Sequence, residues 1–214
     1  MSSSVSQAMA VSMSTDVPVL IHDETLERTT DGTGNVSAHS AHALRQLDAG
    51  RWHGPTFAGE RIPTLDQALE CLLALDITAN IEIKPAIGFE RRTGEVVALA
   101  IAARWPAGLP TPLLSSFSMD ALEAARKVAP DLPRGLLFER LPEDWTARVR
   151  AHGALSVHCD QATLDLQRLQ AVRETGVPLL CYTVNDAARA RELIAAGVAG
   201  LFTDTLDLPQ RCAT

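Results

Sequence analysis

A histidine and several carboxylates follow the first β-rich apolar run of this sequence. Residues 17–21 read Val-Pro-Val-Leu-Ile, and His22 and Asp23 come directly after them, ahead of a Thr/Gly-rich stretch at residues 25–34. A strand that ends in charged residues at a loop is a common way for an α/β protein to expose reactive groups on a rigid base. His22 is therefore a candidate catalytic residue, although a turn or a helix cap is the simpler explanation of a His-Asp pair taken alone.

A second candidate pair lies in the β-branched run at residues 77–85. In a strand, residues two apart share a face, so Glu82 and Lys84 would point one way while Ile81 and Ile83 point the other. The isoleucines suit a packing layer under helices, and the charged pair would then face the interior of a barrel or a cleft. Buried charges need partners. A metal ion with an anionic ligand would provide them, and so would a simple Glu–Lys pair.

The chain from residue 77 onward alternates between strand-like apolar runs and helical patterns. We predict six strands in this part, at residues 77–85, 112–117, 134–139, 154–159, 177–184 and 197–204. The intervening helices fall near residues 93–104, 119–128, 142–152, 164–175 and 186–196. Near-continuous apolar strands that alternate with helices indicate an α/β protein with a parallel sheet and covered faces.

Polar residues gather at the ends of these predicted strands, among them Ser115, Ser116, His158, Thr183 and Asp204. A TIM barrel collects its site residues at one rim in this way. No Gly-rich phosphate-binding motif follows any of the strands, which argues against a nucleotide-binding open sheet. The strand count alone leaves two alternatives, a doubly wound open sheet and a barrel with two further strands.

The N-terminal third carries weaker signals. Thr64 is placed to cap a helix at residues 65–73, whose apolar positions have helical spacing. Ser37 and Gly50 mark the start and stop of a short helix, and a Gly/Pro-punctuated loop follows it. Residues 1–16 are small and serine-rich, and their composition fits either a flexible tail or a poor strand.

Composition narrows the class of protein. The chain has 214 residues, is 46% hydrophobic and carries a net charge of −7, which predicts one globular domain over residues 1–214 and argues against nucleic-acid partners. No apolar run reaches the length of a membrane span. The four cysteines have no close metal-ligand spacing and are expected to be reduced thiols. With no basic, leucine-rich leader, the expected location is the cytoplasm.

Several runs together resemble the glycerophosphodiester phosphodiesterase family of the bacterial, cytoplasmic type. They occur in the family's order: PVLIHD at residues 18–23 with LERTT at 26–30 and Gly32, LDAG at 47–50, AGERIPTL at 58–65, IEIK at 81–84, SSF at 115–117, TVN at 183–185 and GLFTD at 200–204. The resemblance implies a TIM (β/α)8-type barrel. It also implies hydrolysis of small glycerophosphodiesters to an alcohol and glycerol 3-phosphate, in lipid and glycerol metabolism.

The same resemblance assigns roles to individual residues. The family uses a divalent metal, Mg²⁺ or Ca²⁺, held by carboxylates, and two histidines that act as general acid and base. By position His22 is similar to the second of these histidines, Glu82 to a metal-binding carboxylate and Lys84 to a phosphate-contacting lysine. Tyr182 stands where the family commonly has a tryptophan that lines the pocket, which makes it a candidate substrate-binding residue.

The sequence departs from the family pattern at its beginning. It contains no His-Arg-Gly motif, and working back from His22 places Ala8 and Ala10 where the family has a metal-binding Glu-x-Asp pair. We therefore expect an incomplete barrel that lacks the first strand and helix, either truncated at the N-terminus or degenerate, and a metal site with fewer ligands. An open barrel edge would favour a homo-oligomer. The alternative function is an impaired pseudo-enzyme that binds glycerol phosphate or a protein partner.

Overall fold

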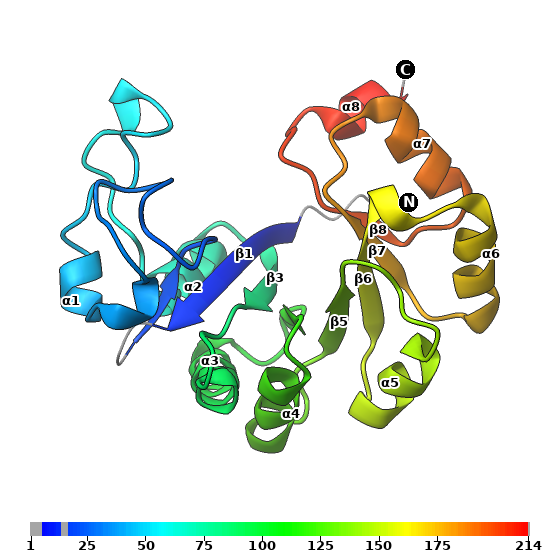
Figure 1. Cartoon of the computed structure of the whole chain (residues 1–214), viewed down its shortest axis with the longest axis horizontal. Coiled ribbons are helices and arrows are strands. Elements are labelled where there is room, and N and C mark those ends of the chain that lie inside the picture. Colours follow the sequence, from blue (N-terminus) through cyan, green and yellow to red (C-terminus); the bar gives the residue numbers. More distant parts are fainter. Residues whose placement is uncertain (1–5, 14–16, 214) are drawn as a thin grey trace. The chain divides into compact units, whose positions relative to one another are not determined.

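The computed structural model describes residues 6–13 and 17–213 of the chain (Figure 1). The chain divides into two compact units, Met1–Pro133 and Arg134–Thr214. None of the helices formed by the described residues is long and apolar enough to cross a membrane.

The strands of the first unit are hydrogen-bonded in the order β2-β1-β3-β4. Their bounds are β1 (Ser6–Met13), β2 (Pro18–Leu20), β3 (Thr78–Ile83) and β4 (Leu113–Ser116). β1 runs parallel to β3, which places Ala10 opposite Glu82, whereas β2 is antiparallel to β1.

Strand β1 decides between the two alternatives for this part of the chain, a flexible tail and a poor strand, in favour of a strand at Ser6–Met13. Ser6–Met13 form a strand because their backbone groups pair with β3 on one side and with β2 on the other, and this pairing overrides the low strand propensity of small polar residues. Residues 1–5 and 14–16 lie outside the described part of the chain.

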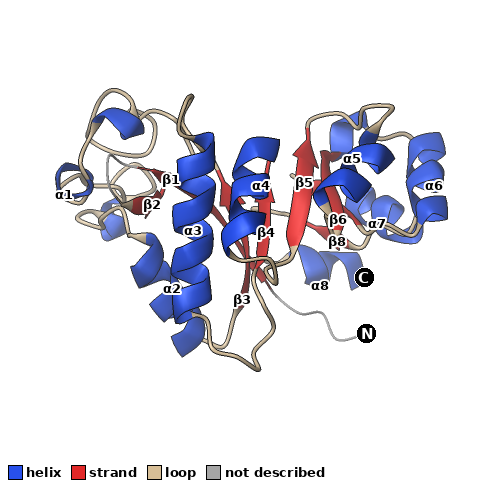
Figure 2. Ribbon diagram, turned by 90° about the horizontal axis from the view of Figure 1, so that it is seen from below, coloured by secondary structure: helices blue, strands red, loops and turns tan. Residues whose placement is uncertain are grey.

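Three helices cover the sheet of the first unit on the same side, α2 (Leu65–Ala74), α3 (Glu90–Arg104) and α4 (Met119–Val128) (Figure 2). Ile81 and Ile83 of β3 are fully buried, as the predicted alternation of faces requires. The predicted cap of α2 is confirmed, since Thr64 and Gln67 form a reciprocal capping box. α3 and α4 approach closely at Gly94, where a Cβ atom would lie 2.0 Å from the carbonyl oxygen of Ala121.

A long connection between β2 and α2 folds around a small core of its own, formed by Val19, Ile21, Leu26, Val36, Leu44 and Ile62. It contains the short helical turns η1 (Val36–Ala38), α1 (Ala41–Leu44) and η2 (Pro55–Phe57). The helix predicted from Ser37 to Gly50 is therefore wrong in its start and length. Ser40 caps α1 by accepting a hydrogen bond from the backbone N–H of Ala43, while Ser37 lies inside the preceding 3₁₀ turn.

The second unit is a parallel sheet with helices on one side (Figure 1). Its strands are β5 (Arg134–Phe138), β6 (Ser156–Asp160), β7 (Leu179–Tyr182) and β8 (Gly200–Leu201). Its helices are α5 (Trp145–His152), α6 (Leu166–Thr175), α7 (Ala187–Ala195) and α8 (Leu208–Ala213), with the 3₁₀ turn η3 (Gln161–Thr163) after β6.

The sequence pattern predicts that His158 lies at a rim with other polar residues, and the structure corrects this placement. Its ring is buried in the middle of β6, within hydrogen-bond distance of Ser156 Oγ at 3.0 Å and against the ring of Phe202. Burial lowers the pKa of the His158 imidazole to about 4, so the ring is neutral at pH 7. Cys159 of the same strand and Cys181 of β7 are buried, and all four cysteines are free thiols.

The fold class is α/β of the TIM-barrel type. In each unit the parallel strands alternate with helices that cover a single face, whereas a doubly wound sheet carries helices on both faces. Among the described residues the parallel strands are β1, β3 and β4 in the first unit and β5 to β8 in the second, one fewer than the eight of a complete barrel.

Candidate functional site

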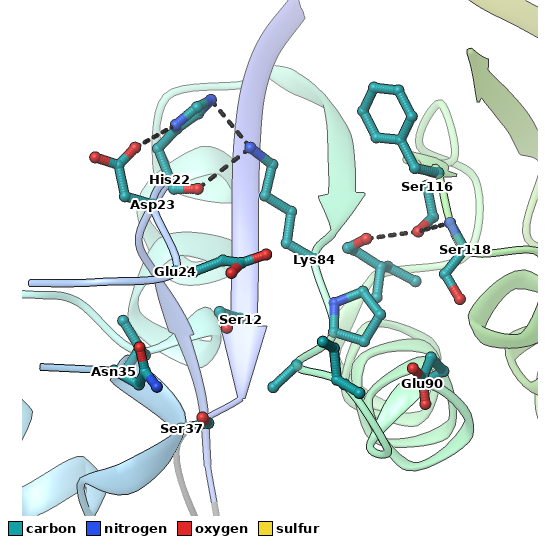
Figure 3. Close-up of a pocket in the computed structure, with 16 residues that line it drawn as sticks. Ser12, His22, Asp23, Glu24, Asn35, Ser37, Lys84, Glu90, Ser116 and Ser118 are labelled. Atoms are coloured by element: carbon teal, nitrogen blue, oxygen red, sulfur yellow. Dashed lines mark hydrogen bonds and ion pairs between the residues drawn. The ribbon is translucent and has the colours of Figure 1, made fainter. Parts of the chain in front are cut away.

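A cavity of about 680 Å³ lies in the first unit, beside the C-terminal ends of β3 and β4 and the loop that follows β2 (Figure 3). The loop after β2 contributes His22, Asp23 and Glu24, and the segments after β3 and β4 contribute Lys84 and Phe117. A parallel sheet presents its strand C-termini at one edge, which is where α/β proteins place their sites. The structure therefore brings the two candidate stretches of the sequence into one cavity.

His22 is held on one side by its sequence neighbour Asp23. His22 Nδ1 lies 2.7 Å from Asp23 Oδ1, and Arg28 reaches the same carboxylate with two nitrogens, its Nε to Oδ2 and its Nη2 to Oδ1 at 2.8 Å. The hydrogen bonds from Arg28, followed by that from His22, hold the pKa of the Asp23 carboxyl well below its usual range despite partial burial. Asp23 is therefore a carboxylate throughout the physiological range, and it can only accept hydrogen bonds.

Lys84 holds His22 on the other side and thereby selects its tautomer. Lys84 Nζ lies 3.0 Å from His22 Nε2 and 3.2 Å from the His22 carbonyl oxygen (Figure 3). An ammonium group has donors only, so Nε2 is the acceptor of this hydrogen bond and the ring proton resides on Nδ1, donated to Asp23. In this arrangement His22 is a neutral imidazole, and its lone pair at Nε2 accepts the hydrogen bond from the lysine.

Glu82 forms an ion pair with Lys84, the residue that contacts His22. Its Oε1 lies 3.7 Å from Lys84 Nζ, an ion pair too long for a hydrogen bond, and this buried oxygen has no hydrogen-bond partner among the described residues. Burial raises the pKa of the Glu82 carboxyl, and the charge of Lys84 opposes that shift in part. Such an unsatisfied buried carboxylate is costly, and it is the type of group that a functional site retains.

The residues present do not fit a divalent metal of the expected kind. Within the described residues, no three histidine, cysteine, aspartate or glutamate side chains gather closely enough to hold an ion. Glu82 offers one carboxylate, and the residue opposite it in β1 is Ala10, which has no ligand atom in its side chain. Mg²⁺ and Ca²⁺ need several oxygen ligands at once. The orphaned Glu82 oxygen is therefore one ligand without the others.

Several residues that line the cavity escaped the sequence analysis: Ser12, Glu24, Asn35, Ser37 and Ser118. The collection of polar residues at strand ends does predict a further lining residue, Ser116, which is the last residue of β4. The Ser116 hydroxyl donates to the carbonyl of Ile83 at 2.6 Å and accepts from the backbone N–H of Ser118 at 3.0 Å. Ser116 thus ties the end of β3 to the turn after β4 and so holds the backbone from which Lys84 extends.

Tyr182 belongs to the second unit. It lies in β7, and its hydroxyl donates to the carbonyl of Phe138 at 2.9 Å. Its expected contact with substrate stays a prediction.

Comparison with known proteins identifies the family to which this chain belongs. The sequence model of the Glycerophosphoryl diester phosphodiesterase family matches residues 11–208, and these include both units. The chain belongs to this family. A glycerophosphodiester phosphodiesterase of Caldanaerobacter subterraneus subsp. tengcongensis is 36% identical, over 87% of this chain and 76% of that protein.

Solved structures of the family have the same fold. An Oleispira antarctica phosphodiesterase, in complex with the product sn-glycerol 3-phosphate, matches 96% of this chain and 82% of its own, with a TM-score of 0.89 and 33% identity. A glycerophosphodiester phosphodiesterase of Agrobacterium tumefaciens matches 97% of this chain and 86% of its own, with a TM-score of 0.71 and 26% identity. These matches confirm the family resemblance and the barrel-type fold that the motifs implied.

Proposed function

We propose that this protein is a phosphoric diester hydrolase that cleaves glycerophosphodiesters to an alcohol and glycerol 3-phosphate at the His22–Lys84 cavity. The observation that carries the proposal is the contact of Lys84 Nζ with His22 Nε2 inside a cavity of about 680 Å³. This contact places a fixed positive charge next to a basic nitrogen. Family membership, and relatives named as glycerophosphodiester phosphodiesterases, support the assignment.

The geometry supports the following roles. The ammonium of Lys84 binds the phosphoryl oxygens of the diester and offsets the negative charge that develops on them. When Lys84 turns to the phosphate, His22 Nε2 becomes free to take a proton from the attacking water. As the bond between phosphorus and the alcohol oxygen breaks on the opposite side of the phosphorus, the leaving alkoxide takes a proton from solvent water, and the His22 imidazolium returns its own proton to solvent. Asp23 stabilises the imidazolium, as the carboxylate of a catalytic triad does.

The expected Mg²⁺ or Ca²⁺ enters this proposal only as a feature of the family, which is generally metal-dependent. Among the described residues no three candidate ligands gather, so no step above runs through a metal. The assay is therefore made with EDTA, with Mg²⁺ and with Ca²⁺, and the three rates show directly whether a cation contributes.

Three broader expectations stay proposals. The family match spans both units, which supports one domain over residues 1–214. The four free thiols support a reducing compartment such as the cytoplasm. Light scattering would measure oligomerisation through an open sheet edge. The edge strand β2 is not wholly unpaired, because the backbone N–H of Leu20 donates to the carbonyl of Pro63.

The test is release of glycerol 3-phosphate from glycerophosphocholine by the purified chain, measured with a coupled dehydrogenase. His22→Gln should slow release by about 10²- to 10⁴-fold. His42→Gln should leave it unchanged, because His42 is an exposed residue of α1 outside the cavity lining. No release by the wild-type chain under all three metal conditions refutes the proposal. Binding of glycerol 3-phosphate without release would favour the pseudo-enzyme alternative.

A further inference from the structure

Arg28 lies outside the cavity lining, but it binds Asp23, which is hydrogen-bonded to His22. Its guanidinium binds both oxygens of Asp23, with Nε on Oδ2 and Nη2 on Oδ1 at 2.8 Å. Asp23 Oδ1 also receives the Nδ1 proton of His22 at 2.7 Å. The planar fork fixes the rotation of the carboxylate, because both oxygens are engaged at once. It therefore also fixes where Asp23 Oδ1 meets the imidazole.

Arg28 is itself held in place from the loop beyond α1. Its Cζ lies 5.8 Å from the ring centroid of Trp52, within the range of a cation–π interaction. The Trp52 indole donates to the carbonyl of Ala49 at 2.9 Å. That loop is anchored by Asp48, whose carboxylate accepts the backbone N–H groups of Gly50, Arg51 and Gly59. A continuous set of contacts thus runs from a rigid loop through Trp52 and Arg28 to Asp23.

We infer that Arg28 is a positioning residue, which acts through Asp23 to keep the proton of His22 on Nδ1 and the lone pair of Nε2 facing Lys84. The effect of Arg28 on catalysis rests on the proposed function. The tautomer of His22 does not, because it can be measured in the protein without substrate. The positive charge of Arg28 is not sufficient to position Asp23. A lysine at position 28 would carry the same charge, but it could not bind both oxygens of Asp23 in one plane.

A simple surface ion pair is the competing explanation. Arg28 has a side chain that is 57% exposed, and exposed pairs often contribute little to stability. The two explanations differ in what they expect at the imidazole. A stabilising ion pair leaves the His22 tautomer unchanged when it is removed, whereas a positioning residue does not.

The experiment follows the His22 ring by long-range ¹H–¹⁵N NMR on the full chain labelled with ¹⁵N-histidine. The wild-type ring should show protonated Nδ1. Arg28→Met should show a larger share of the Nε2-protonated form than the wild type, although Lys84 still opposes that form, and Arg28→Lys should fall between the two. Arg104→Met is the matched control, because Arg104 binds both oxygens of Asp66 at 2.6 Å in a similarly exposed pair outside the cavity lining.

Kinetics provide the second readout. Loss of the carboxylate that sets the tautomer in a serine protease lowers kcat by about 10⁴, and a residue one contact further away should have a smaller effect. Arg28→Met should therefore lower kcat by roughly 10- to 100-fold with KM within about threefold, and Arg28→Lys should recover part of the loss.

The outcomes separate the inference from the proposed function. An unchanged His22 tautomer in Arg28→Met overturns the inference, and so does a changed tautomer with kcat within twofold of wild type. If the wild-type chain releases no glycerol 3-phosphate, the hydrolase assignment fails. The NMR comparison alone then decides whether Arg28 positions His22.

Discussion

Replacement of Glu82 by glutamine should make the protein more stable, and less active because it removes the ion pair that helps to orient Lys84. Glu82 keeps a buried oxygen without a hydrogen-bond partner, and its carboxyl pKa is raised because burial outweighs the charge of Lys84. A group whose folded-state pKa is raised is held in its charged form at a cost when the pH lies above that pKa. Glutamine has nearly the same shape and no charge, so it removes this cost.

The change in the free energy of unfolding caused by Glu82→Gln is the difference between two opposing contributions. At 3.7 Å and an effective dielectric constant of about 20, the Glu82–Lys84 attraction is on the order of 4 kcal/mol. Removing a carboxylate from water costs several kcal/mol, and the raised pKa of Glu82 shows that this term is the larger one. We expect the free energy of unfolding to increase by about 1 kcal/mol at pH 7, since the glutamine amide is also left partly unsatisfied.

The dependence on pH has a definite sign. The penalty is complete when Glu82 is ionised in the folded protein, and it disappears once the pH falls below the ordinary value of 4.5, where the carboxyl is protonated in both states. The advantage of Glu82→Gln over the wild type should therefore be largest at pH 7 to 8 and shrink steadily toward pH 4.5.

Urea unfolding at several pH values measures this effect, and glycerol 3-phosphate release measures the loss of activity. Glu192→Gln is the control, because Glu192 is an exposed partner of Arg189 on α7 and its removal should change the free energy of unfolding by less than about 0.5 kcal/mol. A Glu82→Gln protein less stable than the wild type at pH 7, or a difference that does not vary with pH, would refute the reasoning.

Three further predictions concern the cavity and the loop that supports it. Lys84→Met removes a charged hydrogen bond to substrate worth about 1.5 to 3 kcal/mol, so kcat/KM for glycerophosphocholine should fall by roughly 10- to 150-fold; a change below threefold would contradict the role of Lys84. His22→Gln should lower kcat by about 10² to 10⁴ with its circular dichroism spectrum unchanged, and retained kcat would exclude it as the acid–base group. Asp48→Asn should lower Tm at pH 7, because backbone hydrogen bonds depress the pKa of the Asp48 carboxyl to about 2. Asp48 thus adds stability above its ordinary pKa of 3.8 that is lost as the pH falls toward about 2, so the difference in Tm should vanish there, and a constant difference would argue against it.

The residue of β1 that lies opposite Glu82 affects the surroundings of its charge. Ala10 lies opposite Glu82 in the parallel pair of β1 and β3. An alanine there leaves Lys84 as the only partner of the Glu82 charge within ion-pair range among the described residues. The Glu82 charge therefore depends on Lys84 for its ion pair, so the predictions for Glu82 and Lys84 are best tested together in a double-mutant cycle.

The sequence by itself determined most of the elements and the family. The alternation of apolar runs with helical patterns predicted each strand and α-helix from residue 77 to α7, because these segments carry strong local periodicity. Before them, the cap at Thr64 predicted the start of α2. The ordered motifs, from residues 18–23 to residues 200–204, were enough to indicate the family. The facing of Glu82 and Lys84 away from Ile81 and Ile83 also followed from the two-residue repeat of a strand.

Only the tertiary structure decided how these pieces meet. Strand β1 exists because β2 and β3 pair with it, and His158 is buried although its place near a strand end indicated a rim. The same holds for the state of His22, which depends on Lys84, 62 residues further along the chain, and on Arg28 gripping Asp23 across a loop. Hydrogen-bond partners and burial at these positions come from distant segments, so no local pattern of residues could have specified them.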